Sequence, residues 1–236
     1  MDNSKINQDI TSAFGLDIPP IAMALVNDQP QGVEIIEEDV PSFCTFWRIA
    51  EKKVFYAPAQ KHFNCPIGAM VLGFEMPEKV QEQLGGMVKK MCECSYLSEG
   101  EPANIPTIKE KHTGALYGPL KDFPVDPQLI LIWLKPSQAM IFNEALGCCQ
   151  WSDSMGSMAL GRPACAVIPT ALNDSPFGMS LGCTGMRTFT EINDEHILVT
   201  LNCKEIDVFL KSLQTTVSAN KDMKDFYLEH KKNITG

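Results

Sequence analysis

Short apolar runs separated by helix-forming stretches constrain the fold of this chain more than any other feature of its sequence. Such runs occupy residues 21–26, 53–57 and 129–134, and residues 196–201 have the pattern of a further strand. Runs of about six residues are typical of buried strands, and they are far shorter than the ~20 residues that cross a bilayer. The sequence therefore predicts an α+β protein, with helices flanking a mixed or antiparallel sheet.

Helix signals fill most of the remaining chain. Residues 98–127 are instead rich in proline and show little periodicity, which is typical of a connection. We predict one domain over residues 1–236, built from two related lobes at about 1–97 and 128–236 that this connection joins. A repeated motif supports the two lobes, since Cys44-x-x-Trp47 and Cys148-x-x-Trp151 are each followed by a further cysteine. The helices are expected at residues 4–14, 43–50, 66–73, 78–96, 136–147, 205–217 and 221–231, and residues 163–168 are expected to start a further helix.

Composition narrows the class of protein. The hydrophobic content of 44% is that of a globular chain, and the formal net charge is −9. Nucleic acids and anionic lipids bind to basic protein surfaces. Because this chain is acidic, we expect neither a nucleic acid nor a membrane as its partner. The first nine residues are polar and lack the apolar core of a secretory signal. We therefore expect the protein in the cytoplasm, which is a reducing compartment.

Nine cysteines are present, and an odd number cannot all pair within one chain. In a reducing compartment, clustered thiols indicate metal binding or redox chemistry more often than structural disulfides. Thiolates are soft ligands that suit zinc, copper(I) and iron–sulfur clusters. The chain has neither paired Cys-x-x-Cys motifs nor a ferredoxin-like run of cysteines. Any metal site must therefore take its ligands from distant segments.

Two cysteines lie at predicted helix starts. Cys65 precedes Pro66, and Cys165 follows Pro163. Unpaired amides and the helix dipole favour a thiolate at such positions. The alternative interpretation for each is an inert buried thiol, because cysteine often serves as a small core residue.

Cys183 lies in a glycine-flanked turn. Gly182 and Gly185 would let backbone amides approach its sulfur or a bound anion closely, and Arg187 could stabilise negative charge there. His62, three residues before Cys65, could add a ligand or a proton donor, although a packed or surface histidine is the more ordinary interpretation.

The other cysteines have weaker signals. Cys92 and Cys94 are two residues apart on a predicted helix, so they cannot share one face. Cys203 is expected to be structural at the start of the last amphipathic helix. Cys148 and Cys149 are adjacent and could supply one ligand.

Several segments together resemble a known family. They are Phe43-Cys44-Thr45-Phe46-Trp47-Arg48-Ile49-Ala50, Cys65-Pro66-Ile67-Gly68-Ala69-Met70-Val71-Leu72-Gly73, Pro136-Ser137-Gln138-Ala139-Met140, Ala164-Cys165-Ala166 and Ser180-Leu181-Gly182-Cys183-Thr184-Gly185-Met186-Arg187. The chain resembles a family of bacterial and archaeal proteins that is known as a domain of unknown function and whose archaeal members are described as cysteine-rich. The resemblance extends over most of residues 20–215.

The resemblance places weight on Cys44, Cys65, Cys165 and Cys183. Four thiolates are the number that a cubane cluster or a closed zinc site requires. The chain departs from the family at Asn202-Cys203, where similar proteins tend to have proline after the last strand. That departure puts the helix start there in doubt.

The leading hypothesis is an iron–sulfur protein, with a [4Fe–4S] cluster on these four cysteines, in electron transfer or reductive chemistry with a redox partner protein. Arg187 and the amides of Gly182 and Gly185 would tune the charge of the cluster. A second hypothesis is a non-redox module that binds a small anion at residues 182–185 and at the helix start over 136–140. A third is an enzyme with Cys183 or Cys65 as nucleophile. A homo-oligomer is compatible with all three.

Overall fold

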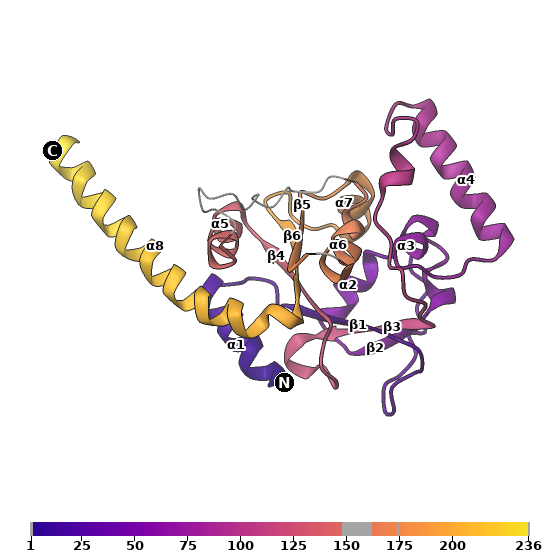
Figure 1. The fold of residues 1–236 in the computed structure, drawn as a ribbon, viewed down its shortest axis with the longest axis horizontal. Helices are drawn as coiled ribbons and strands as arrows, with labels where there is room; N and C mark the ends of the chain where they lie inside the picture. The colour runs from indigo at the N-terminus through magenta and orange to yellow at the C-terminus, as the bar shows by residue number, and fades with distance from the viewer. Residues whose placement is uncertain (1, 148–161, 174, 236) are drawn as a thin grey trace.

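Six strands form one antiparallel sheet in the computed structural model, which describes residues 2–147, 162–173 and 175–235 (Figure 1). The strand order is β2-β3-β1-β4-β6-β5, and every neighbouring pair is antiparallel. This confirms the predicted α+β class. The strands are β1 Ile21–Val26, β2 Phe55–Pro58, β3 Gly114–Pro119, β4 Leu129–Leu134, β5 Phe177–Ser180 and β6 Ile197–Asn202.

The helices cover both faces of the sheet. They are α1 Asn3–Phe14, α2 Thr45–Ala50, α3 Pro66–Val71, α4 Glu78–Glu93, α5 Pro136–Ala145, α6 Val167–Asn173, α7 Thr184–Thr190 and α8 Ile206–Thr235. Short 3-10 turns lie between them, at Ala59–His62 (η1), Glu101–Asn104 (η2), Leu120–Asp122 (η3), Ala164–Ala166 (η4) and Cys203–Glu205 (η5).

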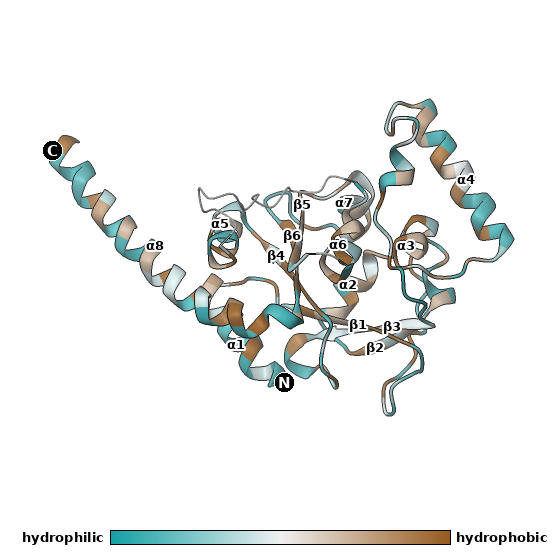
Figure 2. Cartoon of the chain, viewed as in Figure 1, coloured by the Kyte–Doolittle hydropathy of each residue, from teal (hydrophilic) through white to brown (hydrophobic). Residues whose placement is uncertain are grey.

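The alternation of side chains along the strands divides the core into two layers. Ile21, Met23 and Leu25 of β1 point to one face, where they pack with residues of α2, α3, α6 and α7; we call this the α2 face. Ala22 and Ala24 point to the opposite face, which α1, α5 and α8 cover and which we call the α1 face. Figure 2 shows hydrophobic residues concentrated along the central strands between these layers.

Two strands were not predicted, and glycine explains both. β3 lies within the segment that was expected to be an irregular connection. Its Gly118 would carry a Cβ only 2.7 Å from Val54 Cγ2, so glycine lets the neighbouring chain approach closely. A Cβ at Gly178 of β5 would lie 2.5 Å from the carbonyl oxygen of Val167. Both strands are therefore set by tertiary packing, which local propensity does not report.

The last helix is longer than predicted. The two helices expected over 205–217 and 221–231 are a single helix, α8, because Ser218, Ala219 and Asn220 between them contain no helix breaker. Its C-terminal half extends away from the sheet (Figure 1) and has mixed hydropathy (Figure 2). Across the described ranges, no helix combines the length and apolar character needed to cross a membrane.

Candidate metal centre

Four cysteines from distant segments gather on the α2 face of the sheet. Cys44 and Cys165 are buried in this layer, and Cys65 and Cys183 are partly buried against it. Burial raises the pKa of the Cys44 thiol well above its usual value, and the charges of Cys165, Cys65 and Cys183 raise it further. Burial likewise raises the pKa of Cys165, with added contributions from Cys65 and Cys183. The four thiols therefore lie within electrostatic reach of one another.

Each of these cysteines lies at or beside the start of a helical segment. Cys44, Cys65 and Cys183 are the N-cap residues of α2, α3 and α7, and Cys165 is the central residue of η4. The backbone N–H of Met186 donates to Cys183 Sγ at 3.4 Å, so the sulfur takes the role that a serine or aspartate oxygen usually has at an N-cap.

A close contact between α2 and α3 sets the position of Cys65 beside Cys44. Pro66 occupies the first turn of α3, where its missing N–H costs nothing. A Cβ on Gly68 would lie 2.6 Å from Phe43 Cβ, so only glycine lets α3 pack directly on the residue before Cys44. The buried hydroxyl of Ser42 donates to Cys65 Sγ at 3.7 Å and helps to hold this sulfur in place.

Arg187 fixes the turn that carries Cys183. Its guanidinium donates to the carbonyl oxygens of Leu181 at 2.7 Å and of His196 at 3.1 Å. Gly182 has a φ of 93°, and a Cβ there would lie 2.7 Å from Met186 Cε. No described atom lies within 4 Å of a Cβ built on Gly185. These contacts show that Arg187 and Gly182 hold the turn in position. That they also tune the charge of a bound cluster stays a prediction.

The other described cysteines lie apart from this group. Cys92 is half-buried near the end of α4, and Cys94 is exposed just after it. Cys203 is buried on the α1 face, and burial, with the charge of Asp126, raises its pKa to about 12. Cys148 and Cys149 lie outside the described residues. The prediction that Cys203 is structural agrees with its burial at the turn before α8.

A buried histidine and tyrosine pack beside the cysteines. His62 Nε2 lies 2.9 Å from Tyr117 Oη, and Nδ1 lies 3.1 Å from the carbonyl oxygen of Pro58. A carbonyl can only accept, so Nδ1 carries the proton and Tyr117 donates to Nε2. Both ring nitrogens are thus occupied, and His62 is a packed histidine and not a further ligand. Burial raises the pKa of Tyr117, and the charges of Cys44 and Cys165 raise it further.

His62 gives the protein an expected acid sensitivity. Burial lowers its pKa from 6.5 to about 4. Above pH 6.5 the ring is neutral whether the chain is folded or not, but between pH 6.5 and 4 only the unfolded chain takes up the proton. The free energy of unfolding should therefore fall by about 3 kcal/mol as the pH drops through this window. Urea denaturation at steps from pH 7 to pH 4 measures the fall, and a His62→Gln variant should lack this component. An equal fall in the variant would contradict it.

The donor set fits some metal groups better than others. Among the described residues, no three His, Cys, Asp or Glu side chains converge closely enough to hold a metal ion as they stand. A closed zinc site needs four ligands around one ion at about 2.0–2.3 Å. Each cysteine of a multi-iron cluster can bind a different iron, so the sulfurs lie farther apart. Trp47 Nε1, one turn after Cys44, is buried without a described partner, as a donor to such a cluster would be. The spacing of the described side chains therefore argues against a preformed single-ion site at these four thiols.

Comparison with known proteins defines the family but not an activity. The chain belongs to the family of unknown function described as "Uncharacterised ArCR", whose model matches residues 9–211. This confirms the resemblance noted from the sequence. A similar protein is an uncharacterized protein of Methanocaldococcus jannaschii, which is 25% identical over 231 residues that cover 91% of this chain and 96% of the relative. No solved structure matches the chain.

Proposed function

We propose that this protein binds an iron–sulfur cluster through Cys44, Cys65, Cys165 and Cys183 and acts in electron transfer or reductive chemistry. The observation that carries the proposal is that four thiols from four distant segments gather in one layer of the core, where Cys65 and Cys183 act on the buried thiols of Cys44 and Cys165. Four cysteine ligands hold either a [2Fe–2S] or a [4Fe–4S] cluster, and we propose the [4Fe–4S] type.

The energetics of the bare thiols favour a cationic occupant. Burial raises the pKa of Cys44 and Cys165, and each neighbouring sulfur raises it further, so thiolates are costly there without positive charge. A bound metal reverses this relation, because it stabilises the deprotonated sulfur and releases the proton. Without a metal, these neighbouring thiols are costly to deprotonate. This cost supports a centre in which a bound metal stabilises the thiolates.

Residues around the sulfurs are suited to tune such a centre. When bound, the cluster would supply one-electron transfer. Ser42 and the N–H of Met186 donate to the sulfurs of Cys65 and Cys183, and hydrogen bonds to ligand sulfurs shift the reduction potential of a cluster. Phe43, Phe46 and Trp47 are fully buried beside Cys44, so they exclude water from this side of the centre. A redox partner protein follows from the proposal and remains a prediction.

Anaerobic purification from iron-replete cells tests the proposal. We expect brown protein with broad visible absorption and about four iron and four sulfide per chain. Iron, acid-labile sulfide and zinc are measured on the same sample, so that an iron–sulfur cluster can be distinguished from a zinc site. Colourless, iron-free protein would contradict the proposal, and so would one zinc per chain without sulfide.

A further inference from the structure

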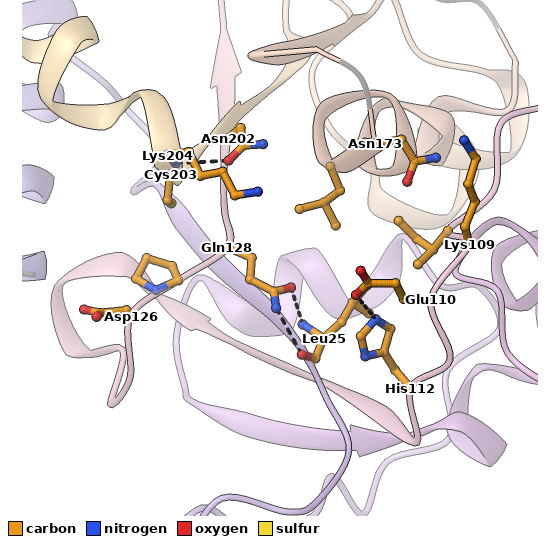
Figure 3. Close-up of a pocket in the computed structure, with 13 residues that line it drawn as sticks. Leu25, Lys109, Glu110, His112, Asp126, Gln128, Asn173, Asn202, Cys203 and Lys204 are labelled. Carbon is orange, nitrogen blue, oxygen red and sulfur yellow. Dashed lines mark hydrogen bonds and ion pairs between the residues drawn. The ribbon is translucent and has the colours of Figure 1, made fainter.

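A cavity of about 690 Å³ opens on the α2 face at one end of the sheet (Figure 3). The end of β1, the segments that lead into β3 and β4, the end of α6 and the turn after β6 together form its wall. The volume lies within the range of pockets that hold small organic molecules. The cavity shares no lining residue with the four-cysteine group.

The cavity combines an apolar wall with polar groups at its edge. Leu25 and Ile108 are buried, and Leu172 is half-buried beside them. Asn173 adds an amide whose Nδ2 donates to the carbonyl oxygen of Thr107 at 2.8 Å. Ligand pockets typically have this composition, in which hydrocarbon fills most of the surface and a few polar groups fix the orientation.

Two lysines bring positive charge to the cavity of an acidic protein. Lys109 and Lys204 lie on opposite sides of it (Figure 3), and neither has an ion-pair partner among the described residues. Among the acidic groups of the lining, the carboxylate of Asp126 points away from the centre (Figure 3) and acts on Cys203. Glu110 lies 3.9 Å from His112 Nε2. Unpaired cations around an apolar cavity favour a bound anion with a hydrocarbon body.

His112 adds a second indication of a bound molecule. Its side chain is only 11% exposed, and its Nδ1 is buried without a partner in the described part of the chain. Buried polar atoms in native proteins nearly always have a partner, so an unsatisfied one at a cavity wall is the kind of atom that an ordered water or a ligand satisfies. A polar group of a molecule bound in the cavity could supply the hydrogen-bond partner of His112 Nδ1.

From these features we infer that this cavity binds a small organic carboxylate, with its hydrocarbon part on Leu25, Ile108 and Leu172 and its carboxylate between Lys109 and Lys204. Helix α6 joins the two sites, because it begins two residues after Cys165 and ends at Asn173 in the cavity wall. Seven residues of helix span about 10 Å. A bound carboxylate would thus lie near the cysteine group, although binding itself does not depend on the proposed cluster.

Isothermal titration calorimetry on anaerobically purified protein tests the inference. The probes are hexanoate and 3-phenylpropionate, each compared with the uncharged alcohol that has the same hydrocarbon body. We expect at least one carboxylate to bind with a Kd at or below about 1 mM, and each alcohol to bind more weakly than its acid. Lys109→Gln and Lys204→Gln should each weaken carboxylate binding roughly fivefold. Lys89→Gln on α4, outside the cavity, is the control and should leave binding unchanged.

Three results would overturn the inference: no carboxylate binding in this range, equal binding of acids and alcohols, or unchanged binding in the double variant Lys109→Gln/Lys204→Gln. Iron and sulfide are measured on every sample. Unchanged iron with lost carboxylate binding would locate the effect in the cavity. Iron-free protein that still binds carboxylate would contradict the cluster proposal alone.

Discussion

Replacing Cys165 with serine is expected to remove nearly all bound iron and sulfide from the protein. Cys165 is buried, and its thiol feels the charges of both Cys65 and Cys183, so its sulfur lies among the proposed ligands. A serine hydroxyl has almost the same size but is a hard, weakly acidic ligand that binds iron poorly. The loss should appear as a fall from about four iron per chain to less than one, with bleaching of the visible absorption.

A matched cysteine controls for the change of side chain. Cys203 is also buried, but it lies on the α1 face, away from the group. Cys203→Ser should therefore keep its iron and its colour. Circular dichroism of both variants shows whether each still folds. A folded Cys165→Ser variant with its full iron content would show that this thiol is only a core residue.

Replacing Gly68 with alanine is expected to destabilise the fold and to disturb the same centre. The new Cβ would lie 2.6 Å from Phe43 Cβ, an atom next to the backbone that cannot swing aside. Overpacking of this kind typically lowers the free energy of unfolding by about 1–3 kcal/mol. Because α3 would have to move away from Phe43, Cys65 would shift relative to Cys44. Iron content should fall along with the urea midpoint.

Gly85 provides the control for Gly68, since it also lies in a helix. A Cβ on Gly85 of α4 meets no described atom within 4 Å. Alanine there should raise the free energy of unfolding by up to about 1 kcal/mol, because alanine is the better helix former, and iron content should not change. Equal stability of Gly68→Ala and the native protein in urea denaturation would show that α3 does not need this contact.

Local signals in the sequence account for much of the candidate centre. Proline after Cys65, proline before Cys165 and glycine before Cys183 each mark a chain turn or helix start, and the structure has a helical segment at each of these cysteines. The strands around 21–26 and 129–134 could also be predicted, because each is a continuous apolar run buried on both faces.

The missed parts depend on distant contacts. Tyr117 lies in β3, a strand that exists because β1 and β2 pair with it on either side. Ser42 gains its role only when α3 brings Cys65 against it. The cavity is made by five separate segments, so no stretch of sequence contains its signature. Sequence periodicity reports which face of an element is apolar, but not which elements meet.

The strand order has a consequence for how the protein is made. Cys44 and Cys65 precede β3, whereas Cys165 and Cys183 follow β4, and the pairing of β1 with β4 joins the two parts of the sheet. A ribosome therefore releases the first two thiols long before the last two exist. Neither part of the chain carries all four proposed ligands, so the proposed cluster could be inserted only after synthesis has passed Cys183. Once inserted, it would act as a cross-link between early and late segments of the polypeptide.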